Sequence, residues 1–345
     1  MLYSNVVFNS AYWKSFTQRP KFTTHDIPDL TGKVAIVTGA NCGLGYATAV
    51  ALAAHGARVF FACRSQLRAL EAIERAKEEI KRKHPQLNPN PEFDFLKLDL
   101  NDMRQCHHAA QQFLDRGLPL HILINNGGIM TTPFALSADG IEQQFAVNHM
   151  GHFVFTMALL DRIKESQPSR IVMLSSIGHE LTVKGGIDFD TLNDKNASNT
   201  TSRYGRSKLA NILIGKALAR RLANEKVYVN MLHPGFVYTN LARNNKKSLG
   251  AIAAGVYDFA GKVCASTPEI GVLNQLYCAT SPEIEEQDIR GRYFVPVGND
   301  CRPSHYALDE ELQEKLWTFS VKLANERIRA RGPEPESEEA KVDMK

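Results

Sequence analysis

Short apolar runs alternate with longer segments of helical character along most of this chain. The apolar runs cover residues 33–38, 58–63, 93–100, 120–124, 170–176, 226–232 and 291–297. The helical segments lie at residues 44–55, 66–83, 101–115, 138–166, 203–224 and 306–330. Continuous apolar runs are typical of strands that are buried on both faces, as in a parallel sheet. The pattern therefore predicts an α/β fold of a single domain, built on a doubly wound parallel sheet.

The two ends of the chain differ from this body and set its predicted boundaries. Residues 1–28 form an arm without the long apolar core of a secretory signal. Its aromatic side chains include Tyr3, Phe8, Tyr12, Trp13 and Phe16. Residues 331–345 are proline-rich and acidic, which predicts a disordered tail. The folded domain is therefore expected to span residues 29–330.

Composition and charge narrow the class of protein. The chain has 345 residues, 43% of them hydrophobic, and a formal net charge of +4. Its basic residues are scattered, so nucleic acid is not an expected partner. No apolar run reaches the roughly 18 residues of a transmembrane helix, although the aromatic arm leaves contact with a membrane surface open. Six widely spaced cysteines without a C-x-x-C pair predict reduced thiols in a cytoplasmic protein. His149 and His152 lack a third ligand at a familiar spacing, so no metal site is predicted.

A glycine-rich stretch, TGANCGLG, follows the first predicted strand and opens the first predicted helix. Gly39, Gly43 and Gly45 let backbone N–H groups approach a pyrophosphate at the positive end of that helix. The second predicted strand ends in Cys63 and Arg64, where NAD-binding proteins place a carboxylate for the ribose hydroxyls. The fork of donors on Arg64 matches a 2′-phosphate instead. We therefore expect a Rossmann-type domain that binds NADP(H). The alternative for Arg64 is a surface arginine that caps a loop.

Tyr204 and Lys208 are four residues apart in the predicted helix 203–224, so their side chains project from the same face. An ammonium group about 4 Å from a phenol is worth roughly 4 kcal/mol at an effective dielectric of about 20. That energy corresponds to roughly three pKa units, which brings a phenol with an ordinary pKa near 10 toward neutrality. The pair is therefore a candidate general acid and base. From these two residues alone, a solvated helix face is the alternative.

Seven short motifs follow one another along the chain. They are TGANCGLG, LDL with Asp99, NNGG at 125–128, VNHMGHF with Asn148, SS with Ser176, YGRSK with Tyr204 and Lys208, and HPGFVYT ending at Thr239. In this order they resemble the short-chain dehydrogenase/reductase family, over a span from about Leu30 to Ala330. The motifs ACRS, VNHMGHF and YGRSKLAN are most similar to the retinol dehydrogenase-like branch. That branch includes the catalytic domain of the WW-domain oxidoreductase, but this chain has no sequence of a WW domain.

The resemblance implies a catalytic set of four residues. Tyr204 is expected to be the general acid/base, and Ser176 is expected to hold the substrate oxygen. Lys208 is expected to bind the nicotinamide ribose hydroxyls and to lower the pKa of Tyr204, while Asn148 holds a water that links Lys208 to solvent. The neighbouring Ser175 points to the opposite face of an extended strand, and the family pattern favours Ser176 as the catalytic serine.

The resemblance also implies which residues bind the cofactor. The glycine-rich turn contributes Gly39, Asn41, Gly43, Leu44 and Gly45, and the catalytic helix contributes Tyr204 and Lys208. Beyond these, the family pattern places Arg64 at the 2′-phosphate, Asp99 at the adenine edge, Asn126 near the adenosine ribose, and the backbone of Val237 and Thr239 at the carboxamide.

Three features depart from the family pattern. Gly127 stands where the family usually has alanine. Residues 178–203 lengthen the spacing between Ser176 and Tyr204, which suits the retinol dehydrogenase-like branch, and they are expected to border the substrate site. We also expect no N-terminal anchor helix like that of membrane-bound members, which argues against inferring retinol as the substrate.

Together these features predict an NADP(H)-dependent oxidoreductase that interconverts a small hydrophobic alcohol and its aldehyde or ketone. Apolar residues in 238–266, where the family keeps a mobile substrate loop, favour a hydrophobic substrate, although they could equally pack a helix onto the body. The alternative is a catalytically weak NADP(H)-binding sensor or interaction protein, which needs the glycine turn but not a tuned tyrosine. By resemblance alone, we also expect a homodimer.

Overall fold

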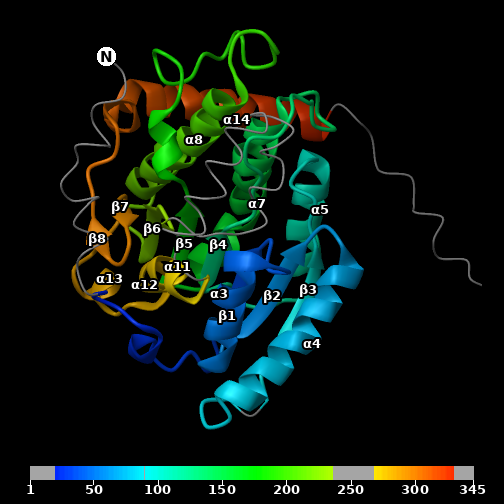
Figure 1. Cartoon of the computed structure of the whole chain (residues 1–345), viewed down its shortest axis with the longest axis vertical. Coiled ribbons are helices and arrows are strands. Elements are labelled where there is room, and N and C mark those ends of the chain that lie inside the picture. Colours follow the sequence, from blue (N-terminus) through cyan, green and yellow to red (C-terminus); the bar gives the residue numbers. More distant parts are fainter. Residues whose placement is uncertain (1–19, 89, 236–267, 330–345) are drawn as a thin grey trace, which may run out of the picture.

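The computed structural model of the protein describes residues 20–88, 90–235 and 268–329 (Figure 1). Within these residues, eight strands form one sheet in the order β3-β2-β1-β4-β5-β6-β7-β8. The strands are β1 (Val34–Thr38), β2 (Arg58–Cys63), β3 (Phe93–Lys97), β4 (Ile122–Asn125), β5 (Ser169–Leu174), β6 (Val227–Leu232), β7 (Tyr293–Val295) and β8 (Asn299–Asp300). Strands β1 to β7 pair in parallel, and the short strand β8 is antiparallel to β7. The predicted α/β fold with a doubly wound parallel sheet is confirmed.

The chain changes its direction across the sheet between β3 and β4. From β1 it moves outward through β2 to β3, and it then returns to the other side of β1 with β4. In open α/β sheets, ligands bind at such a switch point, outside the carboxyl ends of the strands. Thr38 ends β1 and Asn125 ends β4, so these two residues mark the expected site.

Helices cover both faces of the sheet (Figure 1). The long helices are α3 (Gly43–Ala54), α4 (Gln66–Lys83), α5 (Met103–Leu114), α7 (Gly151–Glu165), α8 (Thr200–Arg221) and α14 (Glu310–Arg329). One buried apolar cluster joins the sheet to α5, α7, α8 and α14, and a second joins its other face to α3, α4 and α12 (Leu273–Thr280). Every residue of β1, β4, β5 and β6 is buried. That burial explains why these strands are continuous apolar runs in the sequence.

The shorter elements are less visible in the sequence. They include the 3₁₀-helices η1 (Thr24–Asp26), η3 (Ile177–Glu180) and η5 (His305–Leu308) and the short helices α6 (Gln143–Phe145), α11 (Pro268–Gly271) and α13 (Glu283–Glu286). The apolar pattern does not predict α11, α12 or α13. All residues of α12 are buried, so this helix has no polar face to give it a helical period. Strand β8 has two residues, too few for any period.

Several predicted boundaries are wrong by two residues or more. The predicted helix 138–166 begins only at Gln143, because residues 136 and 142 form an isolated antiparallel bridge around Gly140, whose φ is 74°. The predicted helix 306–330 begins at Glu310, after the turn of η5. The predicted strand 93–100 ends at Lys97. Helix α8 begins before the predicted residue 203, because the side chain of Asn199 caps it by accepting from the N–H of Ser202 at 2.9 Å.

The helix that starts at Gln143 is not uniform. A π-helix, η2 (Ala146–Met150), lies between α6 and α7. Such π-turns are rare within α-helices and are frequent at functional sites. Asn148 is the central residue of η2, and its side chain is fully buried. The irregular turn therefore carries one of the predicted catalytic residues.

The ends of the chain are only partly described. Residues 1–19 of the predicted arm and the whole predicted tail, 331–345, lie outside the described residues. The remaining part of the arm contributes Phe22 and Ile27 to the second apolar cluster, where the Phe22 ring contacts that of Tyr277 with the centroids 5.8 Å apart.

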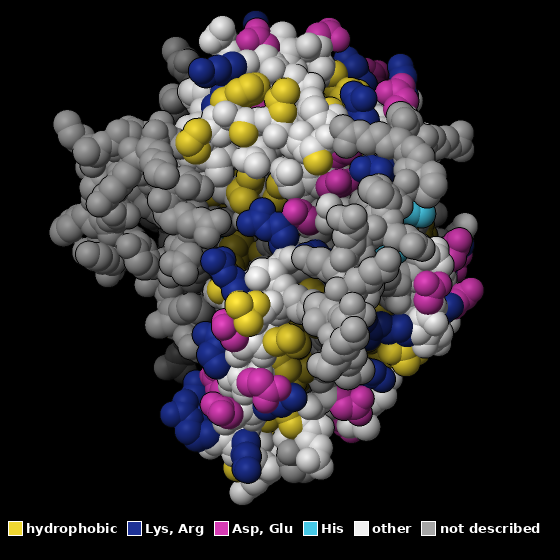
Figure 2. Space-filling model, turned by 90° about the vertical axis from the view of Figure 1, so that its right-hand side faces the viewer, with side chains coloured by type: hydrophobic (Ala, Val, Ile, Leu, Met, Phe, Trp, Pro, Cys, Tyr) yellow, Lys and Arg dark blue, Asp and Glu magenta, His cyan; other side chains and the backbone are white. Residues whose placement is uncertain are grey.

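Charged side chains of both signs are interspersed over the face of the molecule shown in Figure 2. Surfaces that bind nucleic acid gather basic side chains into a patch or stripe. Among the described residues of this face, basic side chains lie next to acidic ones.

Candidate active site

Tyr204 and Lys208 lie on α8, and both are buried, with exposed fractions of 8% and 5%. The Lys208 ammonium nitrogen is 5.8 Å from the centroid of the Tyr204 ring. Helix α8 approaches η3 very closely, because a Cβ atom at Gly205 would come within 2.7 Å of the Gly178 carbonyl oxygen. A Cβ at Gly178 would in turn lie 3.1 Å from the Tyr204 ring and 3.4 Å from the Ser176 hydroxyl. The two glycines therefore allow Ser176 and Tyr204 to lie close together.

Lys208 is a buried cation without a carboxylate within ion-pair distance among the described residues. Its ammonium group donates to the carbonyl oxygen of Leu174 at 3.0 Å, at the end of β5. Burial lowers the pKa of Lys208 to about 8, because the charged form loses its hydration. The lysine is thus mostly protonated at neutral pH but releases its proton more readily than a surface lysine.

Asn148 is fixed in place by three hydrogen bonds. Its amide oxygen accepts from the N–H of Ile129 at 2.8 Å, and its amide nitrogen donates to the Ile129 carbonyl at 2.9 Å. The same nitrogen donates to the Ser207 hydroxyl at 2.9 Å, and Ser207 donates to the Tyr204 carbonyl at 2.7 Å. A Cβ at Gly128 would lie 2.9 Å from the Asn148 amide oxygen and 3.7 Å from the Lys208 nitrogen. The structure therefore brings Asn148 against the helix that carries Tyr204 and Lys208.

The adjacent serines have different surroundings. Ser175 is buried, and its hydroxyl donates to the Lys208 carbonyl at 2.7 Å. Ser176 is partly exposed, and its hydroxyl accepts from the N–H of Gly178 at 3.0 Å, where it caps η3. The Ser176 hydroxyl can still donate a hydrogen bond, whereas that of Ser175 is already committed to the backbone. This difference supports Ser176 as the candidate catalytic serine.

The glycine turn has the shape of an anion-binding loop. Gly39 and Gly43 have φ angles of 67° and 57°, which few residues other than glycine adopt readily. At Gly45 a Cβ would come within 2.5 Å of both the Gly39 carbonyl oxygen and the Asn126 amide nitrogen, so only glycine fits. Helix α3 starts at Gly43 without a side-chain hydrogen bond from its N-cap residue, Cys42.

The first N–H groups of α3 therefore remain available to a phosphate. Asn41 and Leu44 complete this turn. The residues of the turn fit the pyrophosphate of a dinucleotide cofactor.

Thr38 is a functional candidate that the motif analysis does not single out. Its hydroxyl oxygen accepts from the N–H groups of Asn126 and Gly127 at 2.9 and 2.8 Å. The Asn126 side chain donates to the Thr38 carbonyl at 2.8 Å. These bonds join the last residue of β1 to the two residues that directly follow β4. Strands β1 and β4 lie on the two sides of the switch point. The signal in the sequence is the threonine directly before the first glycine of the turn.

His152 connects the Thr38 network to Asn148. Its Nδ1 lies 3.1 Å from the Asn148 carbonyl oxygen, and its Nε2 lies 2.9 Å from the Thr38 hydroxyl. Because a carbonyl oxygen only accepts, Nδ1 carries the proton and Nε2 accepts from Thr38. Burial lowers the pKa of His152 to about 4, so the ring is neutral at physiological pH. His152 therefore links the threonine before the glycine turn to Asn148.

His179 has a similar position behind Ser176. Its Nδ1 lies 2.7 Å from the Ser176 carbonyl oxygen, and its Nε2 accepts from the N–H of Ser304 at 3.1 Å. Burial lowers the pKa of His179 to about 4. A neutral ring with a fixed tautomer thus holds the backbone of Ser176, the candidate catalytic serine.

Two predicted cofactor residues lie at neighbouring strand ends. Arg64 follows β2 and is exposed. Asp99 follows β3 and is partly exposed, and one carboxylate oxygen accepts from the N–H of Asn101 at 3.0 Å. Both residues lie at the same edge of the sheet as the glycine turn, because parallel strands end at one edge. Val237, Thr239 and the segment 238–266 lie outside the described residues.

The part of the chain that the structure describes can also be compared with the requirements of a metal site and of a membrane-spanning helix. It contains no group of three or more potential metal ligands. No helix among the described residues is long and apolar enough to cross a membrane. The five cysteines described, Cys42, Cys63, Cys106, Cys278 and Cys301, are free thiols.

Sequence relatives match this chain over most of its length. The sequence model described as short chain dehydrogenase matches residues 33–250. Retinol dehydrogenase 14 of Homo sapiens is 41% identical over 298 residues, which cover 84% of this chain and 85% of that protein. Short-chain dehydrogenase TIC 32 A, a chloroplastic protein of Brassica napus, is 40% identical over 307 residues, covering 87% and 91%. The WW domain-containing oxidoreductase of Homo sapiens is 37% identical over 308 residues, covering 87% and 70%.

Solved structures share the fold. A crystal structure of a protein from Mycobacterium paratuberculosis has a TM-score of 0.67 at 29% identity and covers 88% of this chain and 97% of its own. A gluconate 5-dehydrogenase from Burkholderia cenocepacia has a TM-score of 0.59 at 21% identity, covering 78% and 95%. The resemblance to the retinol dehydrogenase-like branch is thereby confirmed. This chain belongs to the short-chain dehydrogenase/reductase family of oxidoreductases.

Proposed function

We propose that this protein is an NADP(H)-dependent oxidoreductase that interconverts a hydrophobic alcohol and its aldehyde or ketone. The observation that carries the proposal is the convergence of Tyr204, Lys208, Asn148 and Ser176 at the contact between α8, η2 and η3. A protein that only senses a dinucleotide needs the glycine turn. It does not need a buried lysine beside a tyrosine, which costs stability.

The surroundings of the second strand support NADP(H) rather than NAD(H). Burial raises the pKa of Cys63 to about 12, so the thiol is neutral at the position where NAD enzymes use a carboxylate. The next residue, Arg64, presents an exposed guanidinium at the same strand end. Its donors match the oxygens of a 2′-phosphate. The pyrophosphate would be held by Gly39, Gly43 and the free N–H groups at the start of α3.

The bound nicotinamide supplies a hydride for reduction and accepts one for oxidation. In the direction of reduction, the Tyr204 hydroxyl donates a proton to the substrate oxygen, which becomes the alcohol hydroxyl. The Ser176 hydroxyl donates a hydrogen bond to the same oxygen and holds it. The Lys208 ammonium stabilises the negative charge left on Tyr204. Asn148, which Ile129 and Ser207 hold in place, would bind the water that links Lys208 to solvent.

The hydrophobic character of the substrate rests on less direct support. A human relative of this chain is named retinol dehydrogenase 14, and the segment 238–266 is rich in apolar residues. Homodimerisation and a cytoplasmic location stay predictions. Light scattering at micromolar concentration tests the first, and a monomer would contradict it. Imaging of the tagged full-length chain tests the second, and a label confined to an organelle would contradict it.

The deciding experiment is a turnover assay with purified protein, NADPH and a panel of apolar aldehydes and ketones. We expect oxidation of NADPH by the wild type but not by Tyr204→Phe. Binding of NADPH without turnover of any carbonyl would favour the alternative of a cofactor-binding sensor.

Cofactor choice has its own test. Arg64→Ala is expected to weaken NADPH binding at least about tenfold, because charge-assisted hydrogen bonds are worth roughly 1.5–3 kcal/mol. NADH binding should barely change, since NADH has no 2′-phosphate. Cys63→Asp combined with Arg64→Ala should move the preference toward NADH. Equal weakening of both cofactors by Arg64→Ala would mean that the arginine is structural.

A further inference from the structure

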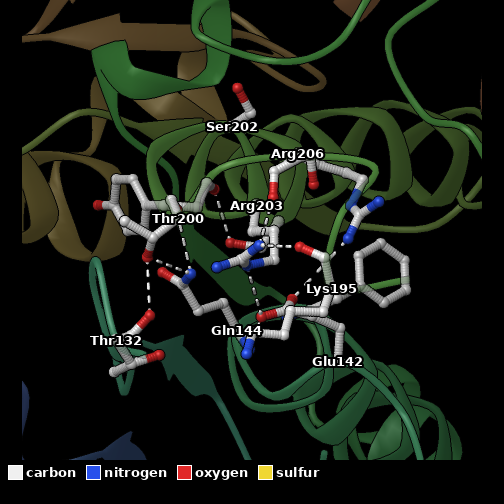
Figure 3. A network of polar contacts seen from close by, with 12 residues as sticks. Thr132, Glu142, Gln144, Lys195, Thr200, Ser202, Arg203 and Arg206 are labelled. Carbon is white, nitrogen blue, oxygen red and sulfur yellow. Dashed lines mark hydrogen bonds and ion pairs between the residues drawn. The ribbon is translucent and has the colours of Figure 1, made fainter. Parts of the chain in front are cut away.

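A cluster of buried charges lies beside the catalytic half of α8 (Figure 3). The Glu142 side chain is fully buried, and the Arg206 and Arg203 side chains are exposed by only 1% and 7%. The two guanidinium groups lie 4.0 and 3.8 Å from the two carboxylate oxygens. Charged side chains are rarely buried this deeply, because each one loses its hydration.

Glu142 belongs to the helix that carries Asn148. Its two carboxylate oxygens accept from the N–H groups of Gln144 and Phe145, at 3.1 and 2.9 Å, and so cap α6. Helix α6 continues directly into η2, of which Asn148 is the central residue. The position of the Glu142 carboxylate is therefore fixed relative to Asn148.

The two arginines belong to the helix that carries the candidate general acid. Arg203 immediately precedes Tyr204, and Arg206 follows it by two residues. Since Arg203 and Arg206 are three residues apart, they project from one face of α8, toward Glu142. The charge cluster thus spans the contact between α6 and the turn of α8 that holds Tyr204.

The same arginines hold residues 192–198, which are part of the segment that lengthens this chain. Arg206 donates to the Leu192 carbonyl at 2.9 Å, and Arg203 donates to the carbonyls of Lys195 and Ser198. The backbone N–H of Glu142 donates to the Asn193 side chain at 2.8 Å. Every member of the cluster therefore contacts this segment as well.

Neutral hydrogen bonds flank the charged cluster along the same contact. The Gln144 amide donates to the Thr200 carbonyl at 3.1 Å, and Thr200 donates to the Thr132 carbonyl at 2.7 Å (Figure 3). At the other end of the contact, Asn148 donates to Ser207 at 2.9 Å. Along α8, the two arginines of the cluster lie between Thr200 and Ser207.

Burial of these charged groups costs free energy of folding, so stabilisation of the fold does not explain the cluster. Burial raises the pKa of Glu142 above its ordinary value, although two backbone N–H groups and both arginines act in the opposite direction. Burial likewise lowers the pKa of Arg206. Such a cluster is instead satisfied in only one arrangement of its groups. It therefore favours one geometry of the contact between α6 and α8.

We propose that Glu142 is a positioning residue that holds the Tyr204 helix in one register against the helix of Asn148. The carboxylate acts through Arg203 and Arg206 and does not touch the reacting groups. The inference rests on the proposed catalytic role of Tyr204. It extends that role by assigning the function of aligning the site to residues outside the family motifs.

Glu142→Gln tests the proposal, with Glu314→Gln as the matched control. Glu314 forms ion pairs with Arg220 and Arg221 at the other end of α8, far along the helix from Tyr204. We expect Glu142→Gln to lower kcat roughly 10- to 100-fold, the range expected for a misplaced reacting group. Its Kd for NADPH should stay within about twofold, because the glycine turn is untouched. Glu314→Gln should change neither quantity. An unchanged kcat for Glu142→Gln overturns the proposal.

Hydrogen exchange gives a readout that needs no turnover. Glu142→Gln should speed amide exchange both in 143–150 and in 200–208, which contact each other through the Glu142 cluster and through the Gln144–Thr200 and Asn148–Ser207 hydrogen bonds. Acceleration confined to 143–145 would show the loss of a cap and overturn the proposal. If the wild type turns over no carbonyl, the proposed function fails, and the exchange experiment still decides whether Glu142 couples the two helices.

A double variant guards against a folding defect. Glu142→Gln combined with Arg206→Gln removes one acid and one base, so the net charge of the cluster is unchanged. We expect this variant to regain only the part of the thermal stability that the charge imbalance costs, since the lost cap bond of α6 is not restored, and to keep the low kcat. Recovery of kcat together with stability would mean that Glu142 acts through stability alone, and would overturn the proposal.

Discussion

Helix α8 carries two pairs of arginines, and each pair faces one glutamate of another element. The two clusters have different surroundings. Near its start, Arg203 and Arg206 face Glu142 in the interior, at 3.8 and 4.0 Å. Near its end, Arg220 and Arg221 face Glu314 of α14 at the surface, and the nitrogen–oxygen distances are shorter, at 2.9 and 2.5 Å.

The side chain of Glu314 is 49% exposed, whereas that of Glu142 is inaccessible. The shorter distances belong to the cluster that we expect to matter less, because water screens a surface pair.

The same comparison applies to the pKa values. The hydrogen bond from Arg221, together with that from Arg220, lowers the pKa of Glu314 to about 2, and partial desolvation of the carboxylate opposes them. Burial has the larger effect on Glu142 and raises its pKa. Surface pairing is therefore favourable but weak, and interior pairing is costly but fixes geometry. The predictions below test this contrast, from the largest expected effect to the smallest.

Tyr204→Phe should produce the largest effect, since it removes the proposed proton donor from the buried half of α8. We expect kcat to fall roughly 10²- to 10⁴-fold, the usual contribution of general acid–base catalysis. The Kd for NADPH, measured by fluorescence titration, should change little because the ring remains. At the surface end, Arg221→Gln should leave kcat unaltered. A Tyr204→Phe variant that keeps more than a tenth of the wild-type kcat would contradict the assigned role.

Much of this half of the helix can be predicted from the sequence. The spacing of Tyr204 and Lys208 places both on one helix face, and the structure places the ammonium 5.8 Å from the ring centroid. The glycine turn is also predictable, because its glycines meet requirements of the local backbone. The seven parallel strands are predictable for a related reason. Burial on both faces makes β1, β4, β5 and β6 continuous apolar runs.

The alignment of α8 with η2 could not be predicted in the same way. Glu142 lies inside the predicted helix 138–166, and nothing in its immediate sequence shows that it caps a later helix start. Its partners, Arg203 and Arg206, are distant in sequence, so no periodicity connects them to it. The π-turn at Asn148 also breaks the helical period without leaving an apolar signature. Long-range polar contacts of this kind depend on how elements pack, and the hydrophobic pattern does not record them.

The next prediction concerns Lys208, whose burial lowers its pKa from 10.5 to about 8. Below pH 8 the native state holds a charge that the unfolded chain solvates better, so the lysine reduces stability by up to roughly 3 kcal/mol. Stability should rise between about pH 8 and 10.5, where only the unfolded lysine stays protonated. Lys208→Met should gain about 1–3 kcal/mol at pH 7 and lose turnover.

The Leu174 carbonyl does not oppose this gain, because Asn211 still donates to it at 2.9 Å. Urea denaturation across this pH range measures the effect. The exposed Lys322→Met on α14 serves as the control and should change stability by less than about 0.5 kcal/mol. A loss of stability in Lys208→Met at pH 7 would contradict the cost assigned to the buried charge.

Glu142→Gln and Glu314→Gln compare the two clusters directly in stability. The amide of Glu142→Gln can accept only one of the two N–H bonds that cap α6, so a loss of about 1–2 kcal/mol is expected. Glu314→Gln should lose about 0–1 kcal/mol, as exposed ion pairs do. Urea denaturation of both variants checks this order. An equal loss in the two variants would remove the distinction between the interior and the surface cluster.

The smallest effect concerns the pH and salt dependence of the surface cluster. Because the folded pKa of Glu314 is about 2 and its ordinary value is 4.5, its contribution to stability is present above pH 4.5. That contribution should disappear as the pH falls from 4.5 toward 2, so wild type and Glu314→Gln should converge there. Salt at about 1 M shortens the screening length to roughly 3 Å and should bring the two curves together at neutral pH as well. Glu142→Gln should keep its deficit in 1 M salt, since ions do not reach a buried cap. A deficit of Glu142→Gln that vanished with salt would mean that the interior cluster is as accessible as the surface one.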